Sequence, residues 1–209
     1  IRGTLSTAVF EKETVNAVGG QLYVANSSVL TGSAVAPGGN HTATQTTMSL
    51  ENVSGFAAGE ILTAKKVHST GFATEYLKVE SSSRFDKASD TNFAGYLYVV
   101  RGYSGSATNP GDGGSGSLGD IASNAQTYSG SQVIVSTGKI GTGYIRLNAN
   151  PNDPYTPYID IVERTGSAIY DIQLKARLGD LSGLSTARLH GTSPSNAGFG
   201  LYSQNVFLE

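Results

Sequence analysis

Short runs in which apolar and polar residues alternate recur along the chain. In residues 170–175, for example, aromatic and aliphatic side chains occupy the even positions, and Asp, Gln and Lys occupy the odd ones. Period-two alternation is typical of a half-buried antiparallel strand. Such runs, bounded by Gly, Asn, Asp or Ser, predict strands within residues 5–10, 21–30, 46–53, 59–67, 75–82, 95–103, 131–138, 143–149, 157–166, 168–179 and 200–209.

One hairpin can be placed in detail. Residues 163–170 read as its turn, with Gly166 and Ser167 at the tip. Across it, Glu163 can face Lys175 and Asp160 can face Asp171; surface ion pairing is the expected use of such groups.

The composition agrees with a β-rich chain. Of 209 residues, 38% are hydrophobic, only 14% are charged, and 27 are Gly, which supplies the positive φ angles of tight turns. No stretch has sustained helical periodicity, so we expect less than about a tenth of the residues in α-helix. The predicted fold class is all-β, with small β-barrel or sandwich modules joined by a Gly/Ser-rich loop and interface strands at the ends.

Charge and cysteine content exclude several functions. The net charge of −2 offers no basic field for nucleic acid, and no apolar run approaches the roughly 20 residues that span a membrane. We therefore expect neither nucleic-acid binding nor membrane insertion. The chain has no Cys, which excludes disulfides and thiolate metal sites and favours folding in a reducing cytoplasm. It starts at Ile1, and we take it as a segment of a longer protein or a processed product.

Composition shifts divide the chain into four parts. We expect N-terminal strands and a linker at 1–45, a small β module at 46–109, a Gly/Ser-rich joint at 110–127 and a sandwich-like domain at 128–209. The joint contains Gly111-x-Gly113-x-x-Gly116, which matches the dinucleotide-binding pattern. However, neither a helix nor the required acidic residue follows it, so a flexible connection without cofactor is predicted.

The 46–109 module resembles a small β module of bacteriophage virion proteins. It has a Thr-rich strand, then Gly-Phe and Gly-acidic-Ile segments, a Glu-aromatic strand, and a strand that ends in Arg-Gly-Tyr-x-Gly. The residues that carry the resemblance are Thr47, Leu50, Gly55, Phe56, Gly59, Glu60, Ile61, Glu75, Tyr76, Val79, Val100, Arg101, Gly102, Tyr103 and Gly105. The chain departs from the pattern in lacking a His after Arg-Gly-Tyr and in its polar insertion before the last strand.

The flanking segments are similar to repeated segments of tail-fibre and tail-tip proteins. The resemblance implies a virion structural protein that forms homotrimers in the tail, touches other tail proteins and contacts a host-surface glycan or protein. Two alternatives remain: a bacterial extracellular adhesin or surface-layer module at the cell surface, and a glycan-cleaving tailspike.

No catalytic or metal-binding pattern stands out. His41, His68 and His190 lie far apart without a second ligand nearby, and no Gly-x-Ser-x-Gly nucleophile motif occurs. Asp160 and Glu163 have an odd offset, which places them on opposite faces of a strand. We therefore expect no enzyme activity and no cofactor.

Two surface features remain as candidates. The Pro-rich loop 148–160 carries Asn152, Asp153, Tyr155 and Tyr158, which can bind a sugar or protein surface, or can pack within their own domain. Asn152 and Asp153 can also help to bind Ca²⁺, although no complete calcium loop is present. In the last strand, both faces are of mixed polarity, which predicts an oligomer contact made by Tyr202, Val206, Phe207 and Leu208.

Overall fold

The computed structural model describes residues 20–32, 41–68, 71–103, 125–150, 153–189, 193 and 196–206. The all-β expectation is confirmed, since the described residues form strands and turns but no α-helix. The strands are β1 (Gln21–Val24), β2 (Ser27–Val29), β3 (Thr47–Leu50), β4 (Ile61–His68), β5 (Gly71–Arg84), β6 (Gly95–Val100), β7 (Val133–Ser136), β8 (Gly143–Asn148), β9 (Tyr158–Arg164), β10 (Ile172–Asp180) and β11 (Phe199–Ser203). Each lies in or across a segment predicted to be a strand, but the single strand predicted at 21–30 is divided into β1 and β2, which join different sheets.

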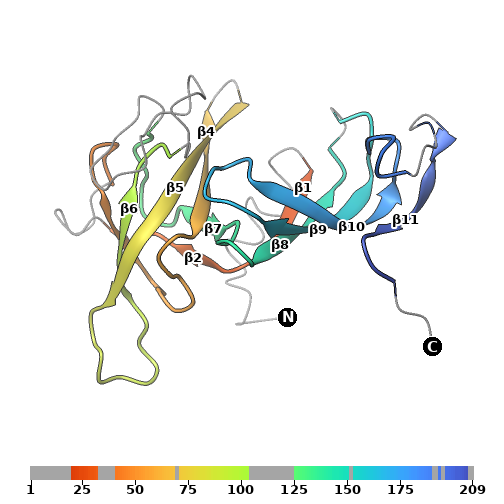
Figure 1. Ribbon diagram of the computed structural model, residues 1–209. Coiled ribbons are helices and arrows are strands. Elements are labelled where there is room, and N and C mark those ends of the chain that lie inside the picture. Colours follow the sequence, from red (N-terminus) through yellow and green to blue (C-terminus); the bar gives the residue numbers. More distant parts are fainter. Residues whose placement is uncertain are drawn as a thin grey trace. The chain divides into compact units, whose positions relative to one another are not determined.

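The strands form two sheets in two compact units (Figure 1). The barrel unit comprises the described residues of 25–142 and 164–172, and its six-stranded sheet has the order β2-β7-β4-β5-β6-β3. The sheet unit comprises those of 20–24, 143–163 and 173–206, with the order β1-β8-β9-β10-β11.

This division differs from the four parts expected along the chain. Strand β7 lies beyond the predicted joint, yet it pairs with β4, with Ile134 opposite Ala64. Strand β1 likewise pairs with β8, with Val24 opposite Ile145. Local alternation identifies strands but not the distant strands with which they pair. The predicted part boundaries therefore could not take these long-range pairs into account. Most of the predicted joint, and the predicted strand at 5–10, lie outside the described residues.

The sheet of the barrel unit curls until its two ends meet. Leu30 bridges Leu50, and the Glu51 N–H donates to the Val29 carbonyl oxygen at 3.0 Å. Alternation in β6 sends Leu97 and Val99 inward. The enclosed core consists of Leu30, Met48, Leu50, Val53, Phe56, Leu62, Ala64, Leu77, Val79, Leu97, Val99, Tyr128 and Ile134. Burying each larger aliphatic side chain contributes roughly 1.5–3 kcal/mol, so the barrel unit has an ordinary apolar core.

A buried ion pair ties separate segments of the barrel unit together. The Arg101 guanidinium donates to both carboxylate oxygens of Glu75, from Nε at 2.7 Å and Nη2 at 3.0 Å, and neither side chain is exposed. The Gly102 and Gln126 N–H groups also donate to this carboxylate. Arg101 further donates to the Thr42, Gln45 and Gln126 carbonyl oxygens. The Glu-aromatic and Arg-Gly-Tyr segments therefore meet here as structural elements.

Glu75→Gln should destabilise the barrel unit by about 3–5 kcal/mol, because it leaves the Arg101 charge buried without a counter-charge. The matched control is Glu80→Gln, which removes a partly exposed pair with Lys78 and should cost less than about 1 kcal/mol. Denaturant unfolding at fixed protein concentration, followed by circular dichroism, measures both. Equal midpoints for the two variants would contradict this role of Glu75.

His41 adds a pH dependence to the same unit. Its side chain is fully buried, and its Nε2 lies 3.0 Å from the Thr31 carbonyl oxygen. Burial lowers its pKa below the ordinary value of 6.5, against an opposing effect of that hydrogen bond, and the Arg101 charge lowers it further. The unfolded state thus binds the proton more readily than the folded state.

The free energy of unfolding should therefore stay constant above about pH 6.5. Below that pH it should fall, by at most about 1.4 kcal/mol per pH unit. In His41→Gln this dependence between pH 7 and 5 should disappear, whereas His190→Gln should retain it. Denaturant titrations across this pH range provide the measurement. An unchanged slope in His41→Gln would show that another group is responsible.

Candidate functional site

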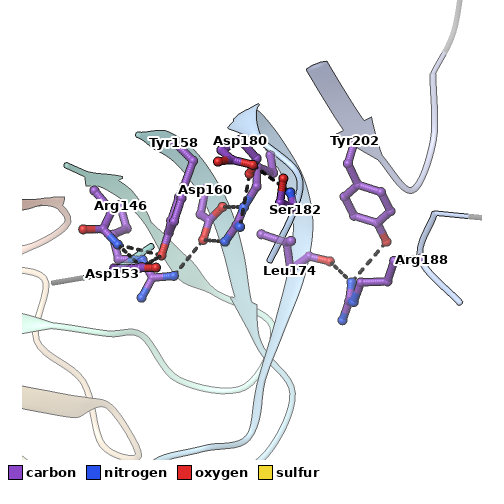
Figure 2. Close-up of polar contacts among 11 residues, drawn as sticks. Arg146, Asp153, Tyr158, Asp160, Leu174, Asp180, Ser182, Arg188 and Tyr202 are labelled. Atoms are coloured by element: carbon purple, nitrogen blue, oxygen red, sulfur yellow. Dashed lines mark hydrogen bonds and ion pairs between the residues drawn. The ribbon is translucent and has the colours of Figure 1, made fainter. Parts of the chain in front are cut away.

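The sheet unit carries a charged cluster on one side of its sheet, here called the polar face. Asp160 of β9 is 1% exposed and lies opposite Arg146 of β8 in the strand register. Arg177 of β10 donates from Nε to Asp160 Oδ1 at 2.6 Å and from Nη2 to Oδ2 at 2.9 Å. Arg146 donates to Oδ2 at 2.7 Å. Figure 2 shows the contact between Arg146 and the Asp160 carboxylate.

Tyr158 completes this cluster. Its ring is buried, and the Arg177 guanidinium lies 3.6 Å from the ring centroid, a cation–π contact. Its hydroxyl accepts a hydrogen bond from Asn148 at 2.7 Å and donates to Asp153 Oδ2 at 3.2 Å. Asp153 Oδ1 in turn accepts the Tyr155 N–H at 3.0 Å. The 153–158 part of the Pro-rich loop is thereby fastened to the sheet.

This geometry favours a structural role for the cluster. Both oxygens of Asp160 are bound by guanidinium groups, which occupy the carboxylate and keep it away from a substrate. For Arg146, burial acts to lower the pKa, but the hydrogen bond and charge of Asp160 together with nearby tyrosines outweigh it and raise the pKa above its ordinary range. A carboxylate bound in this way is a poor general acid or base.

The predicted loop residues separate into two groups. Asp153 and Tyr158 come together within the cluster. Of the two predicted uses of the loop, packing within its own domain therefore applies to these two residues. Tyr158 therefore presents no ring to a ligand, in contrast to the proposed surface-binding use. Tyr155 is 46% exposed beside Gly183 and keeps an accessible ring. Asn152 lies outside the described residues, and so does any calcium site that would use it.

The hairpin prediction is confirmed in one pair and wrong in the other. Lys175 Nζ lies 2.7 Å from Glu163 Oε2, with both side chains partly exposed, as expected for a surface ion pair. Asp160 does not face Asp171, because its carboxylate is bound by the two arginines. Asp171 instead accepts the Ala168 N–H at 2.9 Å and closes the turn.

The predicted oligomer contact stays a prediction, and its four residues lie in different surroundings. Strand β11 ends at Ser203, before Val206, which is 59% exposed. Tyr202 points to the polar face, where its hydroxyl lies 3.1 Å from Arg188 Nη1, so it is used within the chain (Figure 2). Phe207 and Leu208 lie outside the described residues. The exposed apolar side chains of β11 are Phe199 and Leu201, at 69% and 64%.

Phe199 and Leu201 belong to a larger surface on the opposite side of the sheet, here called the apolar face. Cross-strand partners share a side, so the register places Val24, Ile145 and Ile161 in one row and Leu22, Leu147 and Ile159 in the next. Leu178 pairs with Leu201. Leu22, Leu147, Ile159, Leu178 and Phe199 also line one shallow hollow of about 430 Å³. All five strands thus contribute to one aliphatic surface.

Sequence reasoning missed this surface although its signal was present. The alternation in β9 separates Ile159 and Ile161 from Tyr158, Asp160 and Val162. The usual rule buries the isoleucines, but they are 39% and 49% exposed, whereas the other three residues are buried. The two faces are inverted relative to that rule.

Within the described ranges, no group of three or more His, Asp or Glu side chains is arranged to hold a metal ion. The same residues include no helix long and apolar enough to cross a membrane. Comparison with family models, curated proteins and solved structures gives no match for the chain. The apolar face is the candidate functional site, because five strands contribute exposed aliphatic side chains to it.

Asp160→Asn should destabilise the sheet unit by about 3–5 kcal/mol, because two arginines would remain close together around a neutral amide. Glu163→Gln on the same strand should cost less than about 1 kcal/mol, since it removes a partly exposed pair. Denaturant unfolding followed by tyrosine fluorescence at fixed concentration compares the two. A loss below 1 kcal/mol in Asp160→Asn would show that the cluster does not support the sheet.

Proposed function

We propose that the chain is a non-catalytic structural component of a bacteriophage tail fibre or tail tip, and that it works as a homotrimer. The observation that carries the proposal is the exposed aliphatic face of the five-stranded sheet. Water-exposed apolar surface of this extent marks an interaction site in a soluble protein. A subunit that completes its core within an assembly leaves such a face open when it is considered alone.

The polar chemistry of the sheet unit supports the same proposal. Its buried carboxylate and arginines bind one another, which suits a scaffold rather than a reaction centre. The resemblance of the 46–109 module to virion proteins supplies the phage context. Several residues that carry this resemblance have structural roles. Glu75 pairs with Arg101, and the Tyr103 hydroxyl donates to the Ser167 carbonyl oxygen at 2.7 Å. Other tail proteins and the host surface are the further partners of such a component.

Two measurements test the proposal. Light scattering of the purified chain at tens of micromolar should give three times its mass of 21.6 kDa. Antibodies raised against the chain should label the tails of phage particles in electron micrographs. A monomer would contradict the homotrimer. Labelling of bacterial cell surfaces without particles would contradict the tail assignment and favour the adhesin alternative. Release of reducing ends from capsule or lipopolysaccharide would contradict the non-catalytic role.

A further inference from the structure

We propose that the apolar face of the sheet unit packs against the same face of other copies of the chain, so that their sheets share one core. This inference rests on the proposed self-assembly and identifies its surface. It replaces the terminal-strand contact predicted from the sequence with a contact that involves all five strands.

The area of the face is the first argument. The exposed members are Val24 (53%), Ile145 (37%), Ile159 (39%), Ile161 (49%), Leu178 (57%), Phe199 (69%) and Leu201 (64%). If a fully exposed residue of this size presents roughly 150–200 Å², these seven leave on the order of 600 Å² in water, at the upper end for a monomer. A stable interface buries about 800 Å² on each partner. The face thus supplies most of one side of such an interface.

The chemistry of the face is the second argument. Its central rows contain Val, Leu, Ile and Phe side chains, with Asp180 and Glu163 only at strand ends, opposite Phe199 and Gly143. The arginines and Asp160 lie on the polar face. A glycan or nucleic acid needs hydrogen-bonding or charged groups that the central rows do not offer. A second copy offers the same aliphatic surface, and homo-oligomer interfaces are the most apolar class.

The shape of the face is the third argument. Sheets pack face to face about 10 Å apart through interlocking side chains. The hollow between Leu22, Leu147, Ile159, Leu178 and Phe199 gives the side chains of a facing sheet a place to enter. In a homotrimer, a threefold axis turns this face of each copy toward one common core, which produces a closed symmetric assembly.

The absence of Cys from the chain allows a direct test. Ile161→Cys places one thiol on the apolar face, and Ile140→Cys places one in a turn of the barrel unit. Both positions are well exposed in the isolated chain, at 49% and 64%. Labelling with a bulky maleimide reports access to each thiol. A short bismaleimide links two copies where their thiols lie close together.

In the native assembly, the thiol of Ile161→Cys should label at least about tenfold more slowly than that of Ile140→Cys, because a facing copy covers it. The bismaleimide should link copies of Ile161→Cys but not of Ile140→Cys, as seen on a denaturing gel. Ile161→Asp should lower the native mass to that of one chain, while Ile140→Asp should leave the assembly intact. The thiol variants test the surface even if Ile161→Asp does not fold.

The outcomes separate this inference from the proposed function. If the wild-type chain is oligomeric but Ile161→Cys labels as fast as Ile140→Cys, the apolar face is not the contact, and self-assembly stands. If the wild-type chain is a monomer with a protected thiol at 161, the chain covers its own face and the inference is overturned. A monomer with both thiols reactive overturns the inference and the self-assembly together. Antibody labelling of tails tests the virion role independently.

Discussion

The pairing of one carboxylate with two guanidinium groups decides which side of the five-stranded sheet is buried. Asp160 is held by Arg146 and Arg177, and Tyr158 stacks on the second of these arginines. Charges removed from water must be paired and hydrogen-bonded, because a buried charge without a partner is strongly destabilising. Because side chains alternate along a strand, burying this cluster turns Ile159 and Ile161 to the opposite side. The exposed aliphatic face is therefore a direct consequence of the buried ions.

The barrel unit buries its apolar side chains in a different way from the sheet unit. Its curled sheet encloses aliphatic side chains. Among the described residues it has one fully buried ion pair, Glu75 with Arg101, which binds backbone groups of two other segments, at Thr42–Gln45 and at Gln126. The barrel unit thus encloses a complete apolar core. The sheet unit, in contrast, leaves the aliphatic side chains of one face of its sheet exposed. A chain with one completed core and one open face is suited to an assembly in which copies cover that face. This contrast underlies both the proposed structural role and the proposed contact.

The structure shows what several residues of the 46–109 sequence pattern do. Glu75 and Arg101 bind each other, the Gly102 N–H donates to the same carboxylate, and Tyr103 packs with Ile61 and Val100. The positive φ of 85° at Gly59 fits the turn before β4, a conformation that Gly adopts without strain. Such residues define the small barrel, and a fold of this kind does not by itself specify a function.

The sequence alone determined the all-β class, the approximate position of every described strand and the surface pair of Glu163 with Lys175. These features depend on local alternation and on a short turn, both of which can be read from neighbouring residues. Tertiary structure decided that β7 joins β4, that β1 joins β8, and that Tyr158 is buried while Phe199 is exposed. Alternation shows that a strand has two unlike faces, but pairing and burial depend on residues far away in the chain. In β9, the partners of Asp160 come from two other strands, so only the assembled sheet could show that its isoleucines face outward.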